Sequence, residues 1–171
     1  MNLERLEMMR VMMERVAAGS WEPVEFQGQN DLSGRGVGGE FKGFVVKSLD
    51  LSSWACEIRE PAKNICGFSA CAVGHACFDE EFRKLGWSWV RNMPEFDGKS
   101  DWEAVDAFFD FKECYTANHL FSSSHYTKRE RAAYEHLPTK TREAKMVADR
   151  IQELMTIGES HFAPRYSGRN Y

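Results

Sequence analysis

The chain has 171 residues, of which 43% are hydrophobic, 13% aromatic and 28% charged. This composition is typical of one packed globular domain and argues against a disordered chain. The formal net charge of -4 disfavours binding to a phosphate backbone, so nucleic acid is not an expected partner. No run approaches the roughly 20 apolar residues that cross a bilayer, and the charged start is unlike a signal peptide. We therefore expect a cytoplasmic protein that makes no membrane contact.

The first predicted elements are a helix, a loop and a short strand. Apolar residues at three- and four-residue steps predict a helix from Leu3 to Ala18, ending before Gly19. Six glycines from Gly28 to Gly43 predict a long Gly-rich loop over 28–43. A minor β element is expected around residues 41–48.

The rest of the chain is predicted to be largely helical. We expect a two-part helix over 68–85, an aromatic connection through residues 87–96, and helices over 101–109 and 112–121. A basic, exposed helix is expected over 127–136 and a strongly amphipathic one over 141–157, stopped by Gly158. Residues 159–171 are expected to form a tail. The predicted fold is mainly α, a single compact helical domain over 1–171 with a minor β element.

Residues 64–78, NICGFSACAVGHACF, hold three of the five cysteines and one histidine. The chain has an odd number of cysteines, and three of the five lie in this one segment. Both facts predict free thiols in a reducing compartment. Cys66, Cys71 and His75 are the candidate zinc ligands, because thiolates and imidazole are the donors zinc prefers. In a continuous helix Cys77 would lie about 240° around the axis from Cys71 and could not join them.

Two other interpretations of this stretch are open. Cys66, near the expected helix start, or a Cys71–His75 pair could act as a nucleophile. The favoured interpretation is packing: the residues around Cys71 are small on every side, which predicts a central core helix in which His75 donates to a carbonyl or carboxylate. No cofactor is then expected, and zinc remains the alternative.

A second candidate site is formed by arginine and tyrosine residues in the C-terminal third. Such side chains bind phosphates and stack on nucleotide bases. The favoured interpretation is a solvated helix face on which the cations pair with Glu130, Glu135, Glu143 and Asp149. The candidate ligand- or partner-binding residues are Tyr126, Arg129, Arg131, Arg142, Arg165 and Tyr166.

The segment CGFSACAVGHA resembles a family of small uncharacterised phage and bacterial proteins marked by the pattern C-G-x-x-x-C-x-x-G-H/W-A. The matching residues are Cys66, Gly67, Cys71, Gly74, His75 and Ala76. The stretches 120–126 and 147–158 also resemble the family, so the likeness spans most of the chain. Phe68 stands where the family usually has threonine. Since the family has either His or Trp at one position, the resemblance implies that His75 is not an obligatory ligand.

The functional hypothesis that follows is a non-catalytic binding protein of phage or mobile-element type, which inhibits a host defence protein by direct binding. One alternative is a protein that sequesters a small nucleotide, with its pocket at the interface of a homo-oligomer. Another is a Cys/His zinc-binding protein or a Cys-dependent enzyme.

Overall fold

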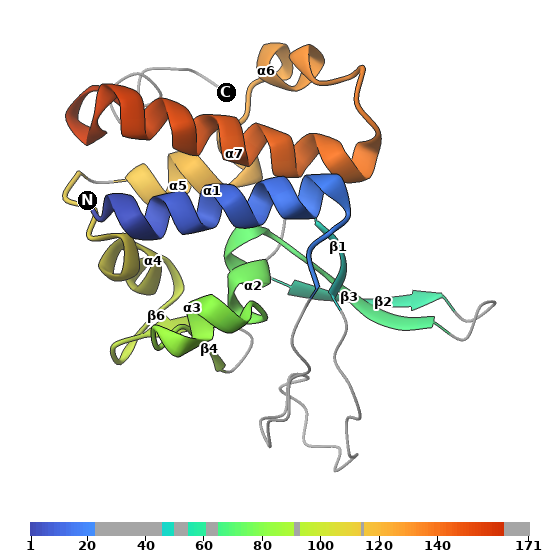
Figure 1. Cartoon of the computed structure of the whole chain (residues 1–171), viewed down its shortest axis with the longest axis horizontal. Helices are drawn as coiled ribbons and strands as arrows, with labels where there is room; N and C mark the ends of the chain where they lie inside the picture. Colours follow the sequence, from blue (N-terminus) through green and yellow to red (C-terminus); the bar gives the residue numbers. More distant parts are fainter. Residues whose placement is uncertain (23–45, 50–54, 61–64, 91–92, 114, 163–171) are drawn as a thin grey trace.

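The computed structural model describes residues 1–22, 46–49, 55–60, 65–90, 93–113 and 115–162 (Figure 1). The predicted Gly-rich loop over 28–43 lies outside these residues. The helices are α1 (Leu3–Ala18), α2 (Ala72–Cys77), α3 (Glu80–Lys84), α4 (Asp101–Phe109), α5 (Thr116–Phe121), α6 (Lys128–Ala133) and α7 (Thr139–Ile157). The strands are β1 (Val46–Leu49), β2 (Ala55–Glu60), β3 (Ile65–Ala70), β4 (Ser88–Val90), β5 (Met93–Phe96) and β6 (Lys99–Ser100). The fold is mainly α with a minor β part, as predicted. None of the helices in the described residues has the length and apolar character of a membrane span.

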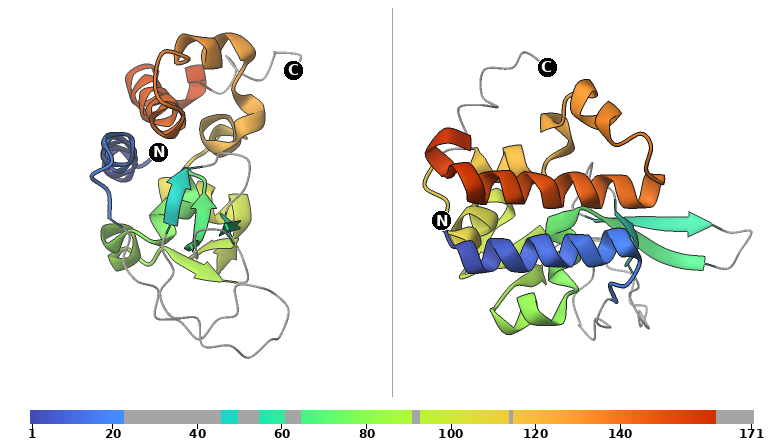
Figure 2. Two further views of the ribbon diagram at one scale, coloured as in Figure 1. Left: turned by 90° about the vertical axis from the view of Figure 1, so that its right-hand side faces the viewer. Right: turned by 45° about the horizontal axis from the view of Figure 1, so that its top comes forward.

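Helices α1 and α7 lie side by side and form the largest helical contact of the molecule (Figures 1 and 2). The start of α7 meets the end of α1, where Thr141 Oγ1 donates to the carbonyl oxygen of Ala17 at 3.2 Å. The Asn2 side chain caps α1 by accepting from the Arg5 amide, and Gly19 ends it in the left-handed region at φ 70°. The buried residues of the two apolar stripes are Leu6, Met9, Met13, Ala144, Val147, Ala148, Ile151 and Leu154.

The β structure forms two small sheets rather than one element. In the first sheet, with order β1-β3-β2, β1 is parallel and β2 antiparallel to β3. In the second sheet, β4, β5 and β6 form an antiparallel meander. The aromatic connection expected over 87–96 is thus a hairpin, in which Trp89 faces Pro94. Alternating burial in β4 explains this outcome, since Trp89 is buried between two half-buried neighbours.

The predicted two-part helix over 68–85 is wrong at its start. Residues 68–70 belong to β3, which pairs with both other strands of its sheet, and the helical part begins only at Ala72. Phe78 and Asp79 separate α2 from α3, and the Asp79 side chain caps α3 by accepting from the Glu81 amide. Small residues such as Ser69 and Ala70 fit a packed strand as well as a helix, so their size did not distinguish the two.

The C-terminal prediction also differs in detail. After Gly158, residues 159–162 form a further helical turn. Phe162 is fully buried, and the Glu159 carboxylate accepts from the amides of Lys112 and Glu113 at 2.7 and 2.8 Å. The first part of the expected tail is therefore packed against the α4–α5 connection. Residues 163–171 lie outside the described chain.

Candidate functional site

The cysteine- and histidine-rich stretch is a strand-to-helix corner. Cys71 is the N-cap of α2, and its Sγ accepts from the Gly74 amide at 3.4 Å. His75 Nδ1 lies 3.0 Å from the carbonyl oxygen of Cys71 and donates to it. His75 is 2% exposed, and burial lowers its pKa to about 4. The imidazole is therefore neutral near pH 7 and is bonded to the main chain rather than to the Cys71 thiol.

The surroundings of His75 agree with the packing interpretation. All six residues of α2 are buried. The centroids of the Trp21 and His75 rings lie 4.8 Å apart, and the Trp21 Nε1 donates to the Asp79 carboxylate at 3.0 Å. Burial raises the pKa of the Cys77 thiol well above its ordinary value, which makes this thiol a poor nucleophile. The prediction of a core histidine bonded to a carbonyl is confirmed.

The structure places the zinc candidates in different elements. Cys66 belongs to β3, whose side chains at 65–69 are not described, whereas Cys71 and His75 belong to the α2 corner. Among the residues whose positions are described, no group of three or more His, Cys, Asp or Glu side chains is arranged to hold a metal ion.

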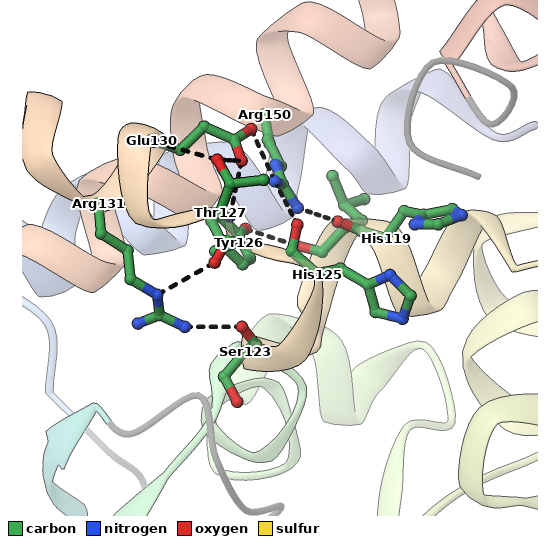
Figure 3. Close-up of polar contacts among 9 residues, drawn as sticks. His119, Ser123, His125, Tyr126, Thr127, Glu130, Arg131 and Arg150 are labelled. Atoms are coloured by element: carbon green, nitrogen blue, oxygen red, sulfur yellow. Dashed lines mark hydrogen bonds and ion pairs between the residues drawn. The ribbon is translucent and has the colours of Figure 1, made fainter. Parts of the chain in front are cut away.

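One of the Arg and Tyr candidates, Tyr126, packs against Arg150, which was not among the selected site residues (Figure 3). Arg150 is 5% exposed and its guanidinium stacks 3.6 Å from the centroid of the Tyr126 ring. It donates to the carbonyl oxygens of His119 and His125, and it forms an ion pair with Glu130 at 2.8 Å. These contacts tie α7 to the segment from α5 to α6.

The Glu130 carboxylate also closes the N-terminus of α6. Its Oε2 accepts from the amide and the hydroxyl of Thr127 at 2.8 and 2.7 Å, while the Thr127 hydroxyl accepts from the Glu130 amide. This is a capping box, and it orients the carboxylate toward Arg150. Burial alone would raise the pKa of Glu130, but the hydrogen bonds from Thr127 and Arg150 outweigh burial and lower it.

Two histidines complete this cluster. The rings of His119 and His125 meet edge to face with centroids 4.4 Å apart. Burial lowers the pKa of His119 to about 4, with a further contribution from His125 and Arg150. Burial and Arg150 also lower the pKa of His125. The His119 imidazole is therefore neutral near pH 7 and adds no positive charge beside the Arg150 guanidinium.

The other candidate residues of this region divide between structural and exposed positions. Arg131 donates to the carbonyl oxygens of Tyr126 and Ser123 at 3.2 and 2.6 Å. Arg142 donates to the carbonyls that end α6, at Tyr134, Glu135 and Leu137. Arg129 is exposed on α6 and takes part in none of these contacts. Arg165 and Tyr166 lie outside the described residues.

A groove of about 390 Å3 is lined by residues of α1 and α3 and by Asp79. Helix α3 lies on the side of α1 away from α7 (Figure 1). The apolar lining residues of the groove are Met8, Val11, Met12 and Phe82, of which Met12 and Phe82 are buried, and its polar lining residues are all acidic: Glu4, Glu7, Asp79 and Glu81. Val11 is 41% exposed and Met8 half-buried, although both are apolar. Exposed apolar side chains gathered in a hollow are typical of a binding surface.

Sequence reasoning did not single out Arg150 among the basic residues of its region and missed the groove, although each had a signal. Arg150 interrupts the apolar stripe of α7 between Val147 and Ile151, a position that predicts a buried arginine. Met8, Val11 and Met12 form a second apolar stripe at three- and four-residue steps, beside the stripe that packs on α7. A helix with two apolar stripes has two faces to cover, and α7 covers only one.

No protein-family model matches the chain, and neither a curated protein nor a solved structure matches it.

Proposed function

We propose that the protein is a non-catalytic binding protein of phage or mobile-element type, which inhibits a host protein by occupying it through the groove between α1 and α3. The groove carries this proposal, because it combines an apolar floor with a charged rim. That combination is how protein interfaces pair a desolvated centre with a polar edge. Val11 is the most exposed of the apolar lining residues and is the expected anchor.

The reactive and charged side chains of the other candidate sites bond within the fold, which supports binding over catalysis. The His75 Nδ1 atom donates to a main-chain carbonyl, and the Cys77 thiol is buried with a raised pKa. The Arg131 and Arg142 guanidinium groups donate to carbonyl oxygens within the domain. These groups therefore hold the fold together, and the nucleotide-sequestering alternative has only Arg129 exposed among its described arginines.

The proposal is tested by capture from a bacterial lysate with matched variants. The full-length protein is compared with Val11→Arg, which places a charge in the groove, and with Glu135→Lys, which changes an exposed residue beyond α6. We expect native mass spectrometry to show one captured polypeptide with the wild type and with Glu135→Lys, and none with Val11→Arg. Equal capture by all three proteins, or a retained small anion in place of a polypeptide, would refute the proposal.

Folding of the variants is checked first by circular dichroism and thermal unfolding. Val11 is 41% exposed, so its substitution should change the free energy of unfolding by no more than about 0.5 kcal/mol. A loss of capture without a loss of stability then reports on the groove itself.

A further inference from the structure

The chemistry of the groove specifies the kind of segment that would fill it. The lining residues of α1 run from Glu4 to Met12, a length of about 12 Å at the rise of an α-helix. The apolar residues follow the helix axis, as they do where one helix packs along another. The half-buried Met8 provides a flexible side chain that adapts to a partner's surface.

The rim of the groove is negatively charged on both sides. Glu4 and Glu7 come from α1, and Glu81 comes from α3, with Asp79 at the N-cap between the helices. Asp79 is already used within the fold, since its two oxygens accept from Trp21 and from the Glu81 amide. The remaining three carboxylates are exposed.

Nearby cations neutralise part of this charge through exchangeable contacts. Glu7 pairs with Arg10 at 2.6 Å, and Glu81 pairs with Lys84 at 2.8 Å. Such surface ion pairs contribute about 0 to 1 kcal/mol each. Lysine or arginine side chains of a partner can therefore replace them at little cost, while Glu4 adds a carboxylate that makes no such pair among the described residues.

From this apolar floor and acidic rim, and resting on the proposed function, we infer that the groove binds a basic amphipathic helix of the partner protein. Two turns of that helix would place apolar side chains over Met8 and Val11. Lysine or arginine residues on both flanks would reach the carboxylates of Glu4, Glu7 and Glu81. This is the helix-in-groove mode of recognition, with charge complementarity determining the kind of helix.

The test uses a synthetic peptide of defined chemistry. The probe is a fluorescein-labelled helix of about 15 residues, with leucines at three- and four-residue steps, lysines on both flanks and alanine elsewhere. Its control has glutamate in place of every lysine. Fluorescence anisotropy is measured with the full-length wild type, Glu4→Lys, Glu81→Lys, Val11→Arg and the matched Glu135→Lys protein.

We expect the lysine peptide to bind the wild type and Glu135→Lys alike, and the glutamate peptide to bind neither. Glu4→Lys and Glu81→Lys should each weaken binding about tenfold, and Val11→Arg should abolish it. Raising NaCl from about 50 to about 300 mM should also weaken binding severalfold, because exposed charges are screened over this range. Binding reduced equally by Glu135→Lys, or unaffected by the groove variants, would overturn the inference.

Other occupants of the groove give distinct results. A dimer that Val11→Arg dissociates would assign the groove to a second copy of the chain. Peptide binding that appears only when Arg165 and Arg169 are both changed to glutamate would assign it to the chain's own C-terminal residues. Either result overturns a basic partner helix. If lysate capture depends on Val11 but not on Glu4, Glu81 or salt, the inference fails and the proposed function stands.

Discussion

Replacing Arg150 with methionine should destabilise the protein more than any other single change of a charged residue in the α5–α7 region. Methionine keeps the unbranched stem but removes the ion pair with Glu130 and the donors to the carbonyls of His119 and His125. Glu130 would be left with Thr127 as its remaining partner in this cluster, and two carbonyl oxygens in a largely buried site would lose a charged donor.

The magnitude follows from these losses. Removing one partner of a buried ion pair costs about 3 to 5 kcal/mol, and each hydrogen bond to a charged group contributes about 1.5 to 3 kcal/mol. The terms overlap because all of them involve one guanidinium, so we expect a loss of about 4 kcal/mol in the free energy of unfolding. For a domain of this size, that loss lowers the melting temperature by roughly 10 °C.

The assay is urea unfolding followed by circular dichroism, with Arg129→Met as the matched control. Arg129 is exposed on α6, so the same substitution there should cost less than about 0.5 kcal/mol. Arg150→Lys should fall between the two, because lysine keeps the charge but loses the planar fork that reaches several acceptors at once. An Arg150→Met loss below about 1 kcal/mol, or one equal to that of Arg129→Met, would refute this account of the cluster.

Three further predictions concern the buried polar groups. The low pKa of His75 makes the free energy of unfolding fall as the pH drops from 6.5 to about 4, because the unfolded chain then binds a proton that the folded chain does not. We expect this free energy to fall by about 3 kcal/mol. In urea unfolding, His75→Gln should show a flatter dependence of stability on pH. Cys71→Ala should cost about 1 kcal/mol by removing the N-cap and Cys71→Ser less, as measured by thermal unfolding; equal losses would argue against the cap. Glu159→Ala should cost about 2 kcal/mol, because two amides and the Thr116 hydroxyl lose their acceptor, and an unchanged urea midpoint would contradict this.

The helices with clear apolar periodicity could be predicted from the sequence. Helix α1 matches its expected bounds, and α7 begins two residues before its expected start, at Thr139. Both carry long stripes and end at glycine, which are local signals. The strand β3 could not be predicted, because its identity depends on pairing with β1 and β2. Strand β1 is the more distant of the two in sequence, and β2 has a mixed composition without a clear strand pattern.

The candidate site was harder to predict for a related reason. The segment 64–78 drew attention because cysteine and histidine are chemically versatile, yet hydrogen bonding to the main chain shows how His75 is used. Tyr126 and Arg131 were correctly grouped in space, but the group that unites the cluster is Arg150, from another helix. The groove depends on α3 leaving part of α1 uncovered, which is a property of tertiary packing.

The most direct test of the central claim is methyl NMR of the full-length protein, labelled with 13C at the methionine methyl groups, with and without its captured partner. Met8 and Met12 line the groove, whereas Met146 and Met155 belong to α7. Binding at the groove predicts that the Met8 and Met12 signals shift or broaden while the α7 signals stay in place. Shifts confined to Met146 and Met155, with Met8 and Met12 unchanged, would place the partner elsewhere and contradict the account.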